Sequence, residues 1–329
     1  MKRFFTLGCI LALTIVFNQA AVAEKVLRLT LQLPATHHLG QNVQSFADEV
    51  NKNTNGEIKV EVYPSAQLYK DKEVPQAVAS GAVEMGVAAL TRFVGTIPAV
   101  DLFYVPFLFD DEEAVKKAVA KGSPVRQPID EAVLKTGARI LWWQAYGGAV
   151  FLSDDLELRT PADLEGKKVR VFSKTLGALV EAAGGAPTSI SGSEQFLAYQ
   201  RGTVDVGITG VTAVQKRKLY QVMNTLTATK SMVDIEFVVL INEKVWQNLS
   251  EEHKQVINTA AARVEKELRE KMSQLEADAF DFVQDKMNVV NLTDAEMAKW
   301  QELAEPVVEE YIKNAGPLGR QLVEAARKL

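Results

Sequence analysis

The first part of the chain alternates between strand-like and helix-like hydrophobic patterns. Val60 and Val62 lie on one side of a segment whose alternate positions are polar, and this period of two predicts a strand. Val43, Phe46 and Val50 recur at helical spacing, which predicts an amphipathic helix. Predicted strands cover 25–33, 57–64 and 83–90, and predicted helices cover 39–56 and 71–81. This order predicts a mainly parallel sheet with helices on its faces.

The same rhythm restarts after residues 146–148, which follow a predicted strand at 138–146. Further strands are predicted at 167–172, 204–210, 222–228 and 234–242, and further helices at 174–184 and 191–202. We expect the strands near 222–241 to return the chain to the first domain. The pattern therefore predicts an α/β clamshell of two domains joined by crossing strands. The first domain is expected to hold 24–147 plus about 236–275, and the second 148–235 plus about 276–329.

One long apolar stripe dominates the C-terminal region between residues 250 and 286. It runs from Val256 to Met287 with almost no glycine or proline, which predicts a helix of about 35 residues and about 50 Å. A solvent-exposed coiled coil is the alternative. The stripe drifts from a strict heptad, which favours packing across both domains.

The N-terminal segment has the pattern of a secretory signal peptide. Lys2 and Arg3 precede a short apolar run, and an A-x-A sequence ends at Ala23. The alternative is a membrane anchor, but the apolar run of about a dozen residues is shorter than the roughly 20 that span a bilayer. We therefore expect cleavage after Ala23 and export of the mature chain.

Composition and charge then narrow the functional classes. Removing residues 1–23 leaves 306 residues with 35 basic and 42 acidic side chains, a formal charge of −7. The single cysteine, Cys9, leaves with the signal peptide, so the mature chain has neither a disulfide nor a thiol nucleophile. The acidic balance argues against a nucleic-acid partner or an anionic membrane surface, although it permits an anionic small ligand.

The sequence lacks the strong signatures of catalysis. It contains no phosphate-binding P-loop, no HExxH and no GxSxG motif, and only three histidines. We therefore expect no catalytic residues, no metal site and no cofactor. A secreted carbohydrate-active enzyme stays open as an alternative, because two distant carboxylates can converge in space.

Candidate binding residues lie where predicted strands end, because ligands of open α/β sheets bind beyond the carboxyl ends of the strands. These positions are His37, His38, Thr91, Arg92, Arg170, Phe172, Ser173 and Thr209. Arg170 is the natural anchor for a carboxylate, since its planar guanidinium forms two parallel charge-assisted hydrogen bonds. The alternative for Arg170 is an interdomain or surface salt bridge.

Several stretches spread over nearly the whole mature chain resemble the solute-binding subunit of TRAP (tripartite ATP-independent periplasmic) transporters, of the dicarboxylate-binding type. They include "EVPQAVASGAVEMGV", "RTPADLEGKKVRV" and "EQFLAYQRGTVDVGITG". The resemblance implies a periplasmic-binding-protein clamshell with a long helix over both domains. It also implies that Arg170 binds the ligand carboxylate and that an integral-membrane permease, driven by an ion gradient, receives the ligand. A binding protein of an ABC transporter is the alternative.

The chain departs from the family pattern near the expected cleft. Many relatives carry a second arginine about twenty residues before the anchor, where this chain has Ala149 and Val150, and many carry an asparagine where it has Thr209. We therefore expect one dominant anionic group in the ligand, and weak binding of uronic acids. Further expected ligand contacts come from Arg92, His37, His38, Asp71 and the aromatic residues Tyr146, Phe172 and Phe237.

Overall fold

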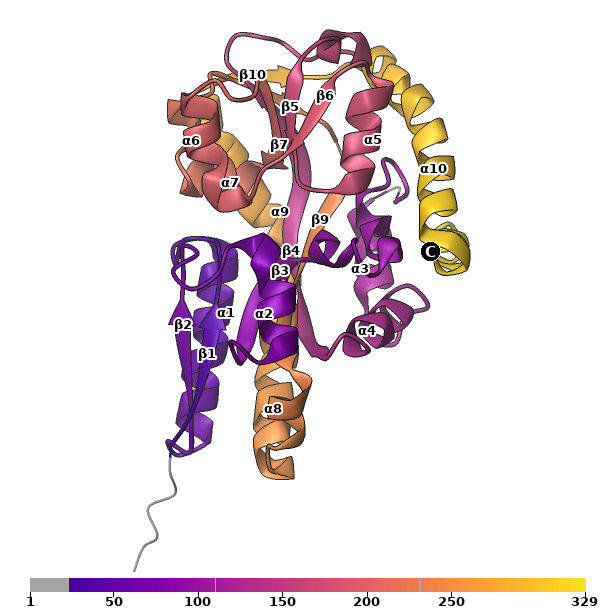
Figure 1. Ribbon diagram of the computed structural model, residues 1–329. Helices are drawn as coiled ribbons and strands as arrows, with labels where there is room; N and C mark the ends of the chain where they lie inside the picture. The colour runs from indigo at the N-terminus through magenta and orange to yellow at the C-terminus, as the bar shows by residue number, and fades with distance from the viewer. Residues whose placement is uncertain (1–23, 110, 231) are drawn as a thin grey trace, which may run out of the picture.

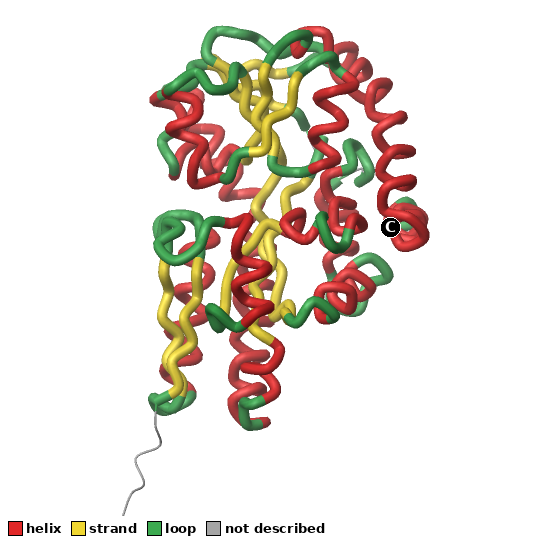
Figure 2. Tube along the Cα trace, viewed as in Figure 1, coloured by secondary structure: helices red, strands yellow, loops and turns green. Residues whose placement is uncertain are grey.

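The computed structural model describes residues 24–109, 111–230 and 232–329. The predicted signal peptide at 1–23 lies outside these residues. Within them, the strands join into one long mixed sheet that divides into two halves, each flanked by its own helices (Figures 1 and 2). The prediction of a two-domain α/β fold is therefore confirmed.

The first domain is built on β1 (Lys25–Thr30), β2 (Ile58–Tyr63), β3 (Met85–Ala89), β9 (Asp234–Asn242) and the first part of β4 (Ala138–Ser153). Its helices are α1 (His38–Asn53), α2 (Val74–Ser80), α3 (Glu112–Val119), α4 (Arg126–Leu134) and α8 (Glu243–Gln247). Strand β1 lies between β2 and β3 and is parallel to both. Strand β9 is antiparallel to both β3 and β4, so it joins β4 to the parallel strands.

The second domain is built on β5 (Lys168–Val171), β6 (Ala186–Ser189), β7 (Val206–Gly210), β8 (Thr225–Ala228), β10 (Asn288–Asn291) and the end of β4. Its helices are α5 (Lys174–Ala182), α6 (Gln195–Gln200) and α7 (Val211–Lys216). Strand β8 pairs with β4 and β10 in this half, so of the two strands expected to return to the first domain only β9 does so. The pattern of alternation did not reveal β10, which has only two apolar residues.

Strand β4 crosses from one half of the sheet to the other over its 16 residues. Its register against β9 shifts between Ala145 and Gly147, at the predicted crossover. Gly147 has φ +103°, and a Cβ built there would lie 2.6 Å from Glu276 Oε1. The crossing therefore requires glycine both for its backbone angle and for the close approach of Glu276.

Helix α9 (Glu251–Gln284) is the predicted long helix, and it packs on both domains. Its Val264 carbonyl accepts a hydrogen bond of 2.7 Å from Asn42 Nδ2 on α1. Further along, Ala279 and Val283 are buried in the core of the second domain. The alternative of a solvent-exposed coiled coil is therefore wrong.

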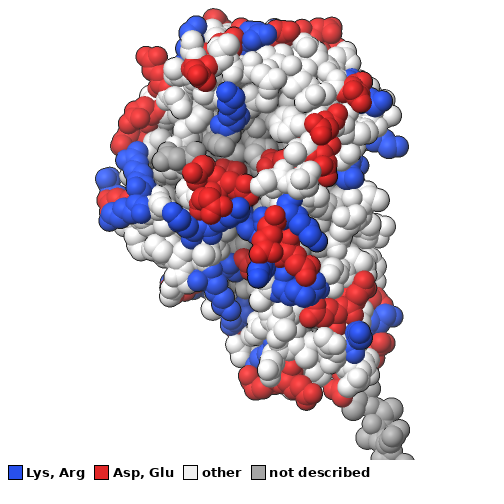
Figure 3. All heavy atoms as spheres, turned by 180° about the vertical axis from the view of Figure 1, so that it is seen from behind, with Lys and Arg blue, Asp and Glu red and all other residues white. Residues whose placement is uncertain are grey.

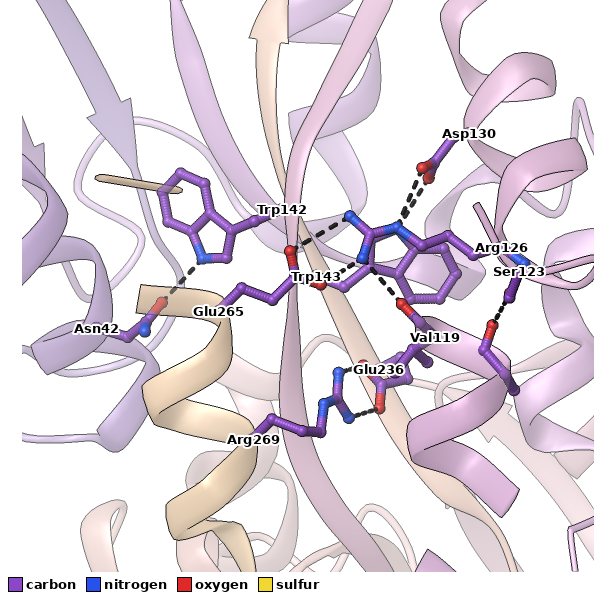
Figure 4. A network of polar contacts seen from close by, with 11 residues as sticks. Asn42, Val119, Ser123, Arg126, Asp130, Trp142, Trp143, Glu236, Glu265 and Arg269 are labelled. Carbon is purple, nitrogen blue, oxygen red and sulfur yellow. Dashed lines mark hydrogen bonds and ion pairs between the residues drawn. The ribbon is translucent and has the colours of Figure 1, made fainter. Parts of the chain in front are cut away.

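Buried ion pairs fasten α9 to the first domain (Figure 4). Arg269 donates to the two carboxylate oxygens of Glu236 on β9, at 2.5 and 2.9 Å. Glu265 pairs with Arg126, which begins α4. These contacts hold the first half of α9 at two points, so that half of the helix moves with the first domain.

A second long helix, α10 (Asp294–Ala326), was not anticipated, because Pro306, Gly316 and Pro317 interrupt its hydrophobic pattern. It bends at Gly316, whose φ is 67°. Trp300 Nε1 donates to the Arg159 carbonyl of the second domain at 3.2 Å, whereas Tyr311 Oη donates to the Ala99 carbonyl of the first at 2.8 Å. The C-terminal segment therefore contacts both domains rather than the second alone, while the exact domain boundaries stay a prediction.

Acidic and basic side chains are interspersed on the face of the molecule shown in Figure 3, and neither sign forms a large patch there. Among the described residues, no helix combines the length and the apolar character that crossing a membrane requires.

Candidate functional site

A cavity of about 290 Å³ of empty space lies between the two domains. It is lined by Gln32, Asp71, Ala89, Arg92, Tyr146, Arg170, Phe172, Gly192, Gln195, Thr209, Arg217, Ile235 and Phe237. Most of these residues lie on or just beyond strands, so the cavity occupies the position that the rule for open α/β sheets predicts.

Arg170 lies at the centre of β5, whose neighbouring residues Val169 and Val171 are buried. Successive side chains of a strand point to opposite faces, so the valines pack on the core while Arg170 and Phe172 share the other face. The guanidinium carbon lies 4.8 Å from the centre of the Phe172 ring. This arrangement explains why a strand with a valine face carries an arginine at its centre.

Two backbone carbonyls fix the Arg170 guanidinium. Nε donates to the Ile190 carbonyl at 3.0 Å, and Nη1 donates to the Ile208 carbonyl at 2.5 Å. The side chain has no carboxylate partner among the described residues, although the residue is only 3% exposed. Burial lowers the pKa of Arg170 to about 10, so the group is still a cation at neutral pH. The result is a buried, oriented and uncompensated positive charge.

Arg92 lies in the same cavity but is neutralised by Asp71. Its Nε forms an ion pair with Asp71 Oδ2, and Asp71 Oδ1 accepts a hydrogen bond of 3.0 Å from the Ala89 backbone. Asp71 is fully buried. The pair therefore contributes polar atoms to the cavity with no net charge.

Arg217 is a lining residue that the sequence did not reveal. It follows the last residue of α7, and its Nη2 approaches the backbone oxygen and Oε1 of Gln32 at 3.3 and 3.4 Å. In the sequence it stands in a Lys-Arg-Lys run, Lys216 to Lys218, that looks like a solvated surface. A helix separates it from the end of β7, so the strand-end rule could not place it.

Aromatic and aliphatic side chains form the walls of the cavity. Tyr146 and Phe237 stack with ring centres 5.0 Å apart, and Tyr104 meets Phe172 edge-on at 5.5 Å. Burial raises the pKa of Tyr146, so its hydroxyl keeps its proton. The cavity thus combines apolar walls with a few polar groups, as small-molecule sites do.

Of the eleven candidate positions, seven line the cavity, whereas His37, His38, Thr91 and Ser173 do not. Thr91 and Ser173 instead donate hydrogen bonds to Asp101. His37 Nδ1 accepts a hydrogen bond from the Leu39 backbone and caps α1, while its ring stacks on Tyr146 at 5.3 Å. His38 Nε2 lies 3.2 Å from the Ala145 carbonyl. Burial lowers the pKa of both, that of His38 to about 4, so both are neutral at pH 7. Both imidazole rings pack against the ring of Tyr146, which itself lines the cavity.

Direct contacts join the two domains beside the cavity. Asp101, on the 3₁₀ helix η3 (Pro98–Tyr104) of the first domain, accepts hydrogen bonds from Ser173 Oγ at 3.0 Å and from the Thr175 backbone and hydroxyl at 3.0 and 3.1 Å. Lys70 and Glu194 form an ion pair of 2.8 Å across the same gap. The structure is therefore the closed form of the clamshell.

The lining residues offer charged and hydrogen-bonding groups beside the apolar walls. No cluster of three or more His, Cys, Asp or Glu side chains suited to a metal ion occurs in the described part of the chain. The one carboxylate among the described lining residues, Asp71, is already paired with Arg92. Chemically, the arrangement presents positive charge and apolar walls to the interior of the cavity.

Comparison with known proteins gives consistent results. The family model described as bacterial extracellular solute-binding protein, family 7, matches residues 30–314. The C4-dicarboxylate-binding periplasmic protein DctP of Rhodobacter capsulatus is 29% identical over 326 residues, which cover 96% of this chain and 95% of that protein. The sialic acid-binding periplasmic protein SiaP of Vibrio cholerae is 27% identical over 298 residues, covering 89% and 90%. A solved TRAP periplasmic solute-binding protein from Polaromonas sp. JS666, bound to D-erythronate, superimposes with a TM-score of 0.86 at 25% identity, over 93% of this chain and 99% of that chain.

Proposed function

Because the chain belongs to family 7 of the bacterial extracellular solute-binding proteins, we propose that it captures an organic acid anion between its two domains for a TRAP transporter. The observation that carries this proposal is the Arg170 guanidinium, which is buried, fixed by two carbonyls and left without a carboxylate partner among the described residues.

The physical reason is the free energy of burying a charge. An ion moved out of water without a counter-charge costs several kcal/mol, and a hydrogen-bonded partner of opposite sign offsets that cost. Nη2 of Arg170 forms no hydrogen bond to a described residue, and the second hydrogen of Nη1 is also available. A ligand carboxylate in the cavity accepts both in the fork geometry that guanidinium groups favour.

The names of the relatives support the class of ligand and the site of action. They are periplasmic proteins for C4-dicarboxylates and sialic acid, and the Polaromonas protein holds D-erythronate, so all three bind small organic acids. The proposal places this chain in the periplasm as well, after loss of residues 1–23. There it passes its ligand to the integral-membrane subunits of the transporter, and it binds without chemical turnover.

Substitution of Arg170 tests the proposal. A thermal-shift screen with small carboxylates first identifies ligands, since a ligand at 100 times its Kd stabilises the folded state by about 2.7 kcal/mol. Calorimetry then compares the wild type with Arg170→Ala and Arg170→Lys. We expect Arg170→Ala to lose about 2–5 kcal/mol of binding free energy, because it leaves a buried anion unpaired. Arg170→Lys should also bind poorly, since an ammonium cannot form the planar fork.

The matched control is Arg201→Ala, which removes an exposed arginine from the same domain and should leave the affinity unchanged. Near-wild-type affinity in a folded Arg170→Ala protein would contradict the anchoring role of Arg170. A screen in which no carboxylate raises the melting temperature would contradict the proposed ligand class.

A further inference from the structure

We propose that Arg217 is a second anion-binding residue, which makes the cavity selective for compact ligands that carry two anionic groups. This inference rests on the proposed function, and it names a residue that determines specificity within that same site.

The charges around the cavity give the first argument. Three guanidinium groups line it, those of Arg92, Arg170 and Arg217, whereas Asp71 is the one carboxylate among the described lining residues. Asp71 neutralises Arg92 through their ion pair. The cavity is therefore left with two positive charges, on Arg170 and Arg217, and one monoanion compensates only one of them.

The contacts of Arg217 give the second argument. Its Nη2 reaches only the neutral oxygens of Gln32, at 3.3 and 3.4 Å, which is long for a hydrogen bond from a charged donor. Its Nε is buried and has no hydrogen-bond partner among the described residues. A buried donor without a partner destabilises the closed form, and an anionic oxygen in the cavity removes that deficit.

A purely structural role explains these contacts less well. Arg217 comes from the second domain and Gln32 from the first, so the pair could serve as a simple strut between them. A strut does not require a charge, however, and the pKa of Arg217 is lowered because burial disfavours its charged form. The unmatched charge and the unpaired Nε both point to a ligand group instead.

This assignment revises the expectation of a single dominant anionic group. That expectation rested on Ala149 and Val150, which occupy the position where many relatives have a second arginine. Both are buried in β4, and neither lines the cavity. Here the second cation comes from the end of α7 instead. The lining residues enclose only a small space, which favours a short diacid over a long one.

Matched pairs of ligands test the proposal. The probes are succinate with butyrate, and glutarate with valerate, because each pair has one carbon skeleton and differs in one carboxylate. We expect the wild type to bind the dianion of a pair at least about tenfold more tightly than the monoanion. Arg217→Gln keeps a hydrogen-bonding side chain without the charge, and it should weaken dianion binding about tenfold or more while changing monoanion binding little.

The outcomes separate this inference from the proposed function. Equal losses for both members of a pair, or monoanions that bind the wild type as tightly as dianions, would overturn the role of Arg217 and leave the anion-binding function standing. Failure of all four acids to bind the wild type, when the screen has identified another carboxylate ligand, would overturn the selectivity for compact diacids and leave the anion-binding function standing. A lower melting temperature of ligand-free Arg217→Gln, with unchanged selectivity, would show that Arg217 is a strut. Arg201→Gln serves as the control for loss of one surface charge.

Discussion

At the scale of single residues, the charges near the crossing strands are unevenly matched. Asp234 begins β9 and pairs with Gly148 of β4. The negative charges of Glu236, Glu276 and Glu112 all disfavour ionisation of the Asp234 carboxyl. Arg269, the nearby cation, forms its ion pair with Glu236 instead. Burial, reinforced by Glu236 and Glu276, raises the pKa of Asp234 to about 7. The folded protein therefore holds this proton more strongly than the unfolded chain does.

This shift predicts a pH dependence of stability. The contribution of Asp234 to the free energy of unfolding is fully present below its unfolded pKa of 3.8 and is lost as the pH rises through about 7. Asp234→Asn cannot ionise, so its free energy of unfolding should not fall with pH for this reason. Relative to the wild type, the stability of the variant should therefore rise by roughly 1–2 kcal/mol between pH 5 and pH 8, a figure reduced because Asp234 is partly exposed. Urea denaturation of both proteins at the two pH values measures the difference. A constant difference across this range would contradict the assignment.

The residues of the site show which signals the sequence carried. Arg170, Phe172 and Thr209 follow from strand periodicity and from the rule that ligands bind at strand ends, and the structure places all three on the cavity. His37 also stands at a strand end, but its side chain caps α1, a choice that periodicity does not determine. Arg217 depends on how far α7 extends and where it points, and both follow from tertiary packing.

At the scale of elements, Asp101 joins η3 of the first domain to the N-terminus of α5 in the second. A carboxylate is favourable at a helix N-terminus, where backbone N–H groups lack partners within the helix. Here the carboxylate comes from the opposite domain and accepts hydrogen bonds from Ser173 and Thr175, while Thr91 of its own domain donates a further one. We expect the contacts with Ser173 and Thr175 to be lost when the two domains separate.

Asp101→Asn should therefore weaken ligand binding without touching the ligand, since Asp101 does not line the cavity. The variant keeps the shape of the side chain but loses its charge, which should cost about 1–2 kcal/mol, or roughly a factor of ten in Kd. We expect the weaker affinity to appear as faster dissociation of the ligand, because the Asp101 contacts form after the ligand has entered the cavity. Stopped-flow kinetics measures this, with the exposed Asp48→Asn as control. An unchanged dissociation rate would show that Asp101 does not hold the closed form.

Helix α9 couples the two domains in a different way. Its contacts with the first domain extend to Ser273, whose hydroxyl donates to Glu112 on α3 at 2.5 Å, and its contacts with the core of the second begin at Ala279. Bending during opening should therefore concentrate between these residues. Ser273→Pro removes a backbone donor there and clashes with the preceding turn, at about 3 kcal/mol or more.

We expect Ser273→Pro to lower the melting temperature and to alter ligand affinity without any contact to the ligand. Glu251→Pro is the matched control, because the first position of a helix tolerates proline and Glu251 begins α9. Calorimetry and thermal melting of both variants give the comparison. If Ser273→Pro behaves like Glu251→Pro in both measurements, the hinge lies elsewhere.

The elements also show where sequence patterns fail. The stripe of α9 is continuous and predicted its helix directly, whereas α10 contains Pro306, Gly316 and Pro317 and is held by packing on both domains. Strand β10 has two apolar residues and depends on pairing with β8. Long-range contacts thus decide the elements whose local pattern is weak or broken.

At the scale of the whole molecule, the two unmatched guanidinium groups of Arg170 and Arg217 make closing conditional. In an open clamshell water solvates both, whereas closing without an anion strips that water from two like charges, at a cost of several kcal/mol for each ion. A protein without ligand should therefore stay open, so the closed conformation indicates that a ligand is bound. If the proposed permease accepts only the closed form, we expect it to transport only when the binding protein carries a ligand.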